Sequence, residues 1–237
     1  MLIYGLNPVL EALRGNRVTR LRVSPRHDKR VNEVIALAQR DGVAVERVDA
    51  QALDRAAKGG VHQGVLADVE DPRDYSIDEL ASGTAPLIVV LDGIEDPHNV
   101  GAILRTCDAA GVSGVIRQER RAAALDGVVG KASAGALTRA RIATVVNIAR
   151  ALEALKEANV WTIGLTGDAD DVYTDVDWTL PSAVVLGAEG RGLRRLVRDR
   201  CDRVVKIPMR GAVDSLNVSV AAGVVLYEAL RQRGEKP

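Results

Sequence analysis

Residues 207–223, with the sequence IPMRGAVDSLNVSVAAG, join a strand to a helix through one short polar loop. The run Arg203–Ile207 is rich in β-branched residues, which favours a strand. The strand must stop at Pro208, because proline has no N–H to donate to a sheet ladder. The polar residues that follow are therefore expected to form a loop at the carboxyl end of this strand.

The helix expected after this loop has apolar residues at a helical period over 218–231, with almost no polar face before Tyr227. A helix that is apolar nearly all round is buried, either in the core of the domain or against another subunit. Ser215 and Asn217 precede it, and both side chains can accept hydrogen bonds from the unpaired N–H groups of a first helical turn. Local sequence therefore explains these two residues by capping as well as by function.

The composition indicates a globular protein with an aliphatic core. Of the 237 residues, 47% are hydrophobic, yet Phe is absent and aromatic residues make up 3%. So few aromatic side chains argue against RNA binding on stacked aromatic platforms. The formal net charge is zero, which argues against indiscriminate binding of polyanions. Basic residues nevertheless gather in segments 14–30, 117–141 and 191–210, any one of which could be a solvated surface.

The sequence contains no pattern that indicates a metal site or a disulfide. Cys107 and Cys201 are isolated, without a CxxC pair, and the histidines are scattered at positions 27, 62 and 98. No apolar run reaches the length of a membrane span, and the first residues lack the regions of a signal peptide. We therefore expect a cytoplasmic protein with no bound metal and no membrane partner.

Residues 1–70 are expected to form a compact α/β unit. Segments with one wet and one apolar face alternate with segments of helical period, and this alternation is typical of a layered α/β domain. The expected strands are 18–23, 43–48 and 65–69, and the expected helices are 6–13, 31–39 and 51–57.

Residues 71–86 are polar, with little apolar periodicity, and are expected to link this unit to a second one. In residues 87–237 the expected strands include near-continuous apolar runs, which are typical of a parallel sheet covered on both faces. The expected strands are 87–91, 114–116, 142–146, 160–165, 183–186 and 204–207. The expected helices are 98–110, 125–137, 148–158, 193–199 and 218–231.

In an open parallel sheet, the loops at the carboxyl ends of the strands converge on a ligand site. Three polar loops, 92–99, 187–192 and 207–217, leave such strand ends. The glycines of the second loop are spaced GxxGxG, which is not the GxGxxG fingerprint of a dinucleotide-binding fold. A nucleotide-dependent dehydrogenase is therefore disfavoured, although these glycines would let a backbone approach a ligand closely.

Together, the three loops resemble the three motifs of the SpoU/TrmH family of RNA ribose 2′-O-methyltransferases. The stretches similar to its motifs are 92–107, DGIEDPHNVGAILRTC; 186–190, LGAEG; and 207–221. Near the start, 4–9, YGLNPV, and 60–64, GVHQG, resemble the ribosomal-protein L30e-like substrate-recognition domain of the RlmB-type 23S rRNA guanosine 2′-O-methyltransferases. The resemblance covers nearly the whole chain.

This resemblance implies a fold, a cofactor and an assembly. The fold would be a small N-terminal α/β domain, 1–70, a linker, 71–86, and a parallel-sheet domain, 87–237, whose end is tied in a trefoil knot. The family implies S-adenosylmethionine as methyl donor, RNA as substrate and a homodimer. By the same resemblance, the donor would be bound at Gly187, Ile207 and Leu216, with Met209 close by.

The family's usual candidate for the general base corresponds to Arg105. Because a guanidinium stays protonated in proteins, we expect Arg105 instead to grip the target phosphate and make the ribose 2′-oxygen more acidic. Asn99, Glu189, Ser215 and Asn217 would shape the same pocket, with Glu189 tethering either Arg105 or its own loop. Much of the acceleration would come from aligning donor and oxygen.

The expected activity is methylation of a guanosine ribose in 23S rRNA. The same chemistry on tRNA is the nearest alternative, but the separate N-terminal unit argues against it. A variant that confers antibiotic resistance, and a non-catalytic RNA-binding or ribosome-assembly protein with the same fold, are further alternatives. Residues 135–138, GALT, depart from the family, whose members often have Glu after a similar segment, so the target nucleotide stays open.

Overall fold

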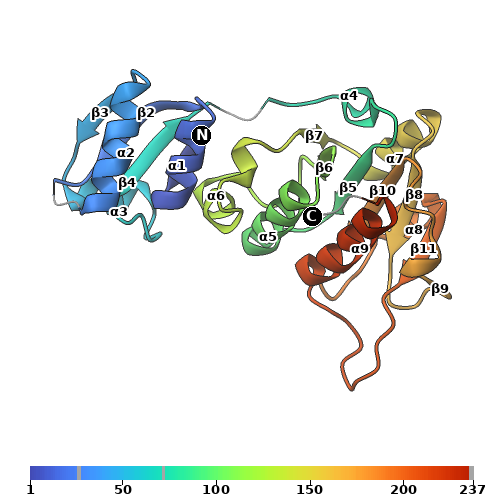
Figure 1. Cartoon of the computed structure of the whole chain (residues 1–237). Helices are drawn as coiled ribbons and strands as arrows, with labels where there is room; N and C mark the ends of the chain where they lie inside the picture. Colours follow the sequence, from blue (N-terminus) through green and yellow to red (C-terminus); the bar gives the residue numbers. More distant parts are fainter. Residues whose placement is uncertain (26–27, 71–72, 235–237) are drawn as a thin grey trace. The chain divides into compact units, whose positions relative to one another are not determined.

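The computed structural model describes residues 1–25, 28–70 and 73–234, and the chain divides into two compact units (Figure 1). Each unit has its own sheet. Unit 1 comprises Met1–Pro72, Val100–Arg105 and Ala124–Arg139, and unit 2 comprises Arg73–Asn99, Thr106–Ala123 and Ala140–Pro237.

Unit 1 is built on a four-stranded sheet in the order β1-β4-β2-β3. β1 and β2 are antiparallel to β4, and β3 is parallel to β2. The elements are β1 Leu2–Tyr4, α1 Leu6–Arg14, β2 Val18–Val23, α2 Lys29–Arg40, β3 Ala44–Arg47, α3 Ala50–Ala56 and β4 Val65–Val69. Val9, Leu21 and Val34 are among the fully buried side chains of its core. The expected α/β layering is confirmed, and β1 is a strand that the sequence pattern missed.

A later part of the chain packs within unit 1. Helix α6, Gly127–Ala132, lies so close to β1 that a Cβ atom on Gly127 would be 2.4 Å from Cε1 of Tyr4. Nη1 of Arg139 forms an ion pair with Oε2 of Glu11 at 2.8 Å. The compact units are therefore not continuous stretches of sequence.

The expected helix 125–137 is interrupted. α6 ends at Ala132, and a 3₁₀ turn, Ala136–Thr138, follows it. Between them Ala134 and Gly135 have positive φ angles of 51° and 91°. A left-handed backbone cannot continue a right-handed helix, so the prediction of one helix was wrong. Apolar periodicity alone did not reveal this break.

Unit 2 is built on a seven-stranded sheet in the order β7-β6-β5-β10-β8-β11-β9, and every pairing in it is parallel. The central strands β5 and β10 are almost wholly buried, as their apolar runs predicted. The strands are β5 Leu87–Asp92, β6 Gly114–Gln118, β7 Ile142–Val145, β8 Trp161–Leu165, β9 Asp171–Val172, β10 Ser182–Gly187 and β11 Arg203–Lys206. The helices are α4 Ile77–Ala81, α5 Pro97–Ala109, α7 Ile148–Glu157, α8 Arg195–Arg200 and α9 Val218–Gln232, with a 3₁₀ turn at Tyr173–Asp175.

The expected linker contains an ordered helix. α4 begins with a capping box, in which the Ser76 hydroxyl accepts from the N–H of Glu79 and the Glu79 carboxylate accepts from the N–H of Ser76. Leu80 is fully buried in the core of unit 2. One buried leucine among polar residues was too weak a signal for a helix. Residues 71 and 72 of this stretch lie outside the described residues.

The last strands of the chain do not follow one another in the order of the sheet. β10 is inserted between β5 and β8, β11 adds beyond β8, and α9 then returns to contact β10. The segment between β11 and α9 loops away from the sheet (Figure 1). One side of α9, including Ala222, Val225 and Leu226, is buried, whereas Val220 and Tyr227 are about half exposed. One apolar face of α9 is therefore uncovered in the single chain.

Candidate functional site

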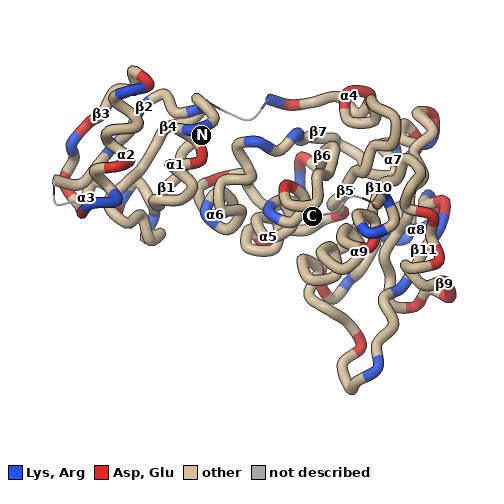
Figure 2. Tube along the Cα trace, in the orientation of Figure 1, with Lys and Arg blue, Asp and Glu red and all other residues tan. Residues whose placement is uncertain are grey.

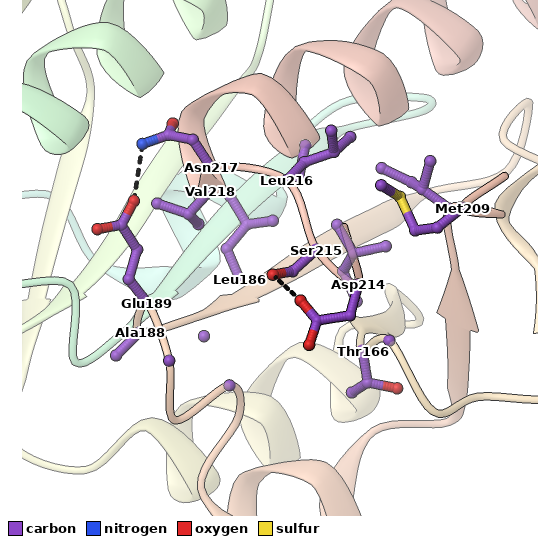
Figure 3. A pocket seen from close by; sticks show the side chains of 17 residues that line it. Thr166, Leu186, Ala188, Glu189, Met209, Asp214, Ser215, Leu216, Asn217 and Val218 are labelled. Atoms are coloured by element: carbon purple, nitrogen blue, oxygen red, sulfur yellow. Dashed lines mark hydrogen bonds between the residues drawn. The ribbon is translucent and has the colours of Figure 1, made fainter. Parts of the chain in front are cut away.

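A cavity of about 640 Å³ lies at the carboxyl edge of the unit 2 sheet. The ends of β8 and β10, the loops after β8, β10 and β11, and the first turn of α9 line it (Figure 3). Cavities of this size commonly hold small molecules and cofactors in proteins. The position agrees with the expectation that loops at this edge converge.

The side chain of Asn217 joins the three polar loops. Its Nδ2 donates to Oδ1 of Asn99 at 2.9 Å and to Oε1 of Glu189 at 2.7 Å. Its Oδ1 accepts from the N–H of Ser219 at 2.9 Å and so caps α9. Figure 3 shows Asn217 and Glu189 pointing toward each other at one side of the cavity. The side chain of Asn217 therefore caps α9 and joins the three loops at the same time.

The loop after β10 folds back on itself beneath the cavity. The N–H of Ala188 donates to the carbonyl of Gly192 at 3.2 Å, and the N–H of Gly192 donates back at 2.8 Å. A Cβ atom on Gly187 would lie 2.2 Å from the carbonyl carbon of Gly192. Only glycine fits there, because no real side chain tolerates backbone atoms at that distance. The loop thus presents mainly backbone to the cavity.

A buried ion pair anchors the end of this loop to β5. The Asp92 side chain is fully buried and accepts from the backbone N–H of Arg194 at 2.9 Å and from its Nε at 2.6 Å. Nη2 of Arg194 also contacts Oδ1 of Asp92. A buried carboxylate needs such a complete set of donors. The first and second polar loops are therefore tied together at their base.

The four residues predicted to bind the donor, Gly187, Ile207, Met209 and Leu216, all line the cavity. Of the residues predicted to shape the pocket, Glu189, Ser215 and Asn217 also line it. Asn99 is buried in the first turn of α5 and is hydrogen-bonded to Asn217. The structure thus brings these side chains to one site, while their roles stay predictions.

Ser215 does not cap α9, because its exposed hydroxyl donates to Oδ1 of Asp214 at 2.8 Å. The Glu189 carboxylate accepts instead from Nδ2 of Asn217 in the third loop, which is neither of the two tethers expected for it. Arg105 is exposed further along α5 and is not a lining residue of the cavity. Any contact of Arg105 with a reacting atom stays a prediction.

Sequence reasoning missed the loop after β8. Thr166 and Gly167 line the cavity, as does Asp214. A hydrogen bond from Arg198 lowers the pKa of the neighbouring Asp168 below its usual value. The available signal was the end of the strand at Leu165, but that loop becomes relevant only because β10 lies directly beside β8.

Neither thiol belongs to a reactive site. Burial raises the pKa of Cys107 to about 12 and that of Cys201 to about 12. Both thiols are therefore protonated at neutral pH, whereas nucleophilic cysteines have a lowered pKa. Within residues 1–25, 28–70 and 73–234, no three His, Cys, Asp or Glu side chains are placed to hold a metal ion. In the same ranges, no helix has both the length and the apolar character needed to cross a membrane.

Two family models together match most of the chain. Residues 86–227 match the model of the SpoU rRNA Methylase family, and residues 2–75 match the model described as RNA 2′-O ribose methyltransferase substrate binding. The chain belongs to the SpoU rRNA methylase family. Membership predicted from the three loop motifs is thereby confirmed.

Curated relatives in this family match almost end to end. The chain is 43% identical over 242 residues to the 23S rRNA (guanosine-2′-O-)-methyltransferase RlmB of Yersinia pestis, covering 99% of this chain and 98% of that protein. It is 41% identical over 240 residues to RlmB of Escherichia coli K12, covering 98% of each.

Among solved structures, the SpoU methyltransferase AviRb from Streptomyces viridochromogenes, in complex with AdoMet, aligns with a TM-score of 0.84 at 28% identity. The alignment covers 98% of this chain and 90% of that one. The fold class predicted for the SpoU chain, an N-terminal α/β domain followed by the knotted parallel-sheet domain of this family, is confirmed.

Proposed function

We propose that this protein transfers the methyl group of S-adenosylmethionine to the ribose 2′-hydroxyl of a guanosine in 23S rRNA. One observation carries the proposal: Asn217 joins three separate loop motifs at the edge of a cavity of about 640 Å³. The names of the RlmB relatives supply the substrate and the reaction. The AdoMet complex of AviRb supplies the donor.

The cavity suits this donor chemically. Its wall consists of glycine backbone from the β10 loop, apolar side chains such as Ile207 and Leu216, and a few polar groups from Thr166 and Asp214. Backbone N–H and C=O groups can read an adenine, and apolar side chains can cover its faces. When bound, S-adenosylmethionine supplies an activated methyl group on its sulfonium, so the protein's task is alignment of the incoming oxygen.

The polar residues divide this task among them. Asn217, Asn99 and Glu189 hold the loops in one arrangement and so keep the cavity formed. Ser215 lies beside them, with its hydroxyl oriented by Asp214. Arg105 grips the phosphate of the target nucleotide and makes its 2′-oxygen more acidic, since a fixed positive charge favours a developing oxyanion.

The rest of the chain would select the target. We assign residues 1–70 to RNA recognition, 71–86 to the connection and 87–237 to methyl transfer. This assignment is supported by the two family-model matches at 2–75 and 86–227.

The uncovered face of α9, with Val220 and Tyr227, supports a homodimer in which a second copy buries it. A cytoplasmic location agrees with two cysteines that form no disulfide among the described residues and with an rRNA substrate.

The test is methylation of RNA by the purified protein. Unmethylated 23S rRNA and total tRNA are incubated with methyl-labelled S-adenosylmethionine, and 2′-O-methyl positions are mapped. We expect label at one guanosine of 23S rRNA and none in tRNA. Label in tRNA alone would favour the tRNA alternative. Absence of both labelling and donor binding would favour a non-catalytic RNA-binding or assembly protein.

The role of Arg105 has its own test. R105A should abolish methyl transfer while binding of S-adenosylmethionine, measured by calorimetry, persists. The matched control is R200A, because Arg200 is an exposed arginine ion-paired with Glu153 on helix α7. Equal loss of donor binding and methyl transfer in R105A would contradict the role of Arg105 in binding the target phosphate.

A further inference from the structure

Ion pairing separates the arginines of segment 191–210 into two groups. The paired group engages carboxylates within unit 2, and most of these contacts are short. The pairs are Arg194–Asp92, Arg195–Asp199 at 3.8 Å, Arg198–Asp168 at 2.7 Å, Arg200–Glu153 and Arg203–Asp171 at 2.5 Å. Five of the cations in this segment are thus neutralised by the protein itself.

The other cations of the segment are Arg191, Lys206 and Arg210. None of them forms an ion pair or side-chain hydrogen bond with another residue in the described parts of the chain. Arg191 is exposed between Gly190 and Gly192, both of which line the cavity, and Arg210 is exposed next to the lining residue Met209. Unpaired positive charge therefore flanks the cavity from two loops.

The same distinction holds across unit 2. Exposed arginines without a carboxylate among the described residues also follow β6, at Arg120 and Arg121, and β7, at Arg150. Arg117, at the end of β6, likewise lacks one, but it is buried, and desolvation lowers its pKa. Because all strands of this sheet are parallel, these positions share the carboxyl edge with the cavity.

The mixture of charges at this edge favours contacts to individual RNA phosphates over a general attraction of RNA to the surface. Acidic residues, including Glu95 and Glu119, are exposed at the same edge, and the whole chain has no net charge. Figure 2 shows acidic and basic residues interspersed along the trace. A uniform field is therefore absent, and binding must come from individual cations placed to meet individual phosphates. From β6 to β11 the strand order spans about 19 Å at the usual spacing, enough for several nucleotides.

We propose that Arg191 and Arg210 bind RNA backbone phosphates on either side of the nucleotide to be methylated. The proposal rests on the proposed function and adds the groups that position the substrate over the cavity. A guanidinium suits the task, because it makes paired hydrogen bonds to phosphate and keeps its charge. The two side chains come from different loops, so together they fix the path of the RNA backbone across the cavity.

The test measures how RNA affinity depends on salt. Binding of unmodified 23S rRNA transcript by the full chain is measured by filter retention at several KCl concentrations, for wild type, R191A, R210A and R191A/R210A. Each lost phosphate contact should reduce the slope of log K against log[salt] by about 0.7–0.9, and the double variant should lose about twice that. Calorimetry should give an unchanged affinity for S-adenosylmethionine.

The control variant R200A/R231A removes the same charge from arginines that are ion-paired to Glu153 and Glu228. Its salt slope should equal that of wild type. A wild-type slope in R191A/R210A, or an equal loss in the control, would overturn the proposal. The readout needs no methyl transfer, so failure of the proposed function, seen as absent methylation by the wild type, is a separate outcome.

Discussion

Replacing Asn217 by Asp separates the two tasks of this side chain. Asp caps a helix about as well as Asn, so Oδ1 of the new residue can still accept from the N–H of Ser219. It can no longer donate to Asn99 and Glu189, and it brings a second carboxylate to a contact that is 2.7 Å long in the wild type. N217D therefore keeps the cap and breaks the junction of the loops.

The size of the effect follows from the bonds lost. A neutral hydrogen bond contributes about 1 kcal/mol, and one to a charged group about 1.5–3 kcal/mol. Glu189 and Asn217 are exposed, so water replaces part of this, and about 1–2 kcal/mol remains. If that energy must be spent to re-form the cavity, the affinity for S-adenosylmethionine falls about 5- to 30-fold.

The assay is calorimetric titration of S-adenosylmethionine into wild type, N217D and N217A, with thermal unfolding of each. N217A should also lose the cap, which costs about a further 0.5–2 kcal/mol of stability. N217D should unfold at a higher temperature than N217A yet bind the donor as weakly. Wild-type donor affinity in N217D would refute the reasoning and leave capping as the only role of Asn217.

Two further predictions concern the donor loop and acid stability. G187A should destabilise the protein by about 1–3 kcal/mol and abolish donor binding, because the added Cβ would overlap the backbone of Gly192. The control is G211A, since a Cβ atom added at Gly211 would have no other atom within 4 Å. Normal donor binding by G187A in calorimetry would contradict this prediction. Hydrogen bonds from Arg231 lower the pKa of Glu228 from 4.5 to about 2, so its contribution to stability is present above pH 4.5 and is lost as the pH falls toward 2. The difference in Tm between wild type and E228Q should therefore shrink between about pH 6 and pH 3, and a constant difference would exclude this linkage.

Elements with a strong local pattern were predictable. The strands Val18–Val23 and Val65–Val69 have the predicted bounds, and the apolar runs at 87–91 and 183–186 form the buried centre of the second sheet. Elements with weak local patterns were missed: β1 is short, and α4 has a single buried leucine. Periodicity reports which face of a segment is buried, but it does not report what covers that face.

The site was predictable only in part, for the same reason. The motifs placed Gly187, Ile207, Met209 and Leu216 at one edge, because strand ends are readable and the edge of a parallel sheet is shared. The loop after β8 and its Thr166 could not be assigned without knowing that β10 lies beside β8.

By itself, the sequence determined the α/β class, the parallel sheet, the family and part of the lining of the cavity. The tertiary structure decided which elements cover one another, as when residues 124–139 pack within unit 1. It also decided that Asn217 rather than Ser215 caps α9. Among the described residues, Arg198 and Arg200 have ion-pair partners, whereas Arg191 and Arg210 have none. Period, caps and motifs act over a few neighbouring residues. Contacts such as Asn217 to Asn99 join residues 118 positions apart, and only the order of the strands brings them together.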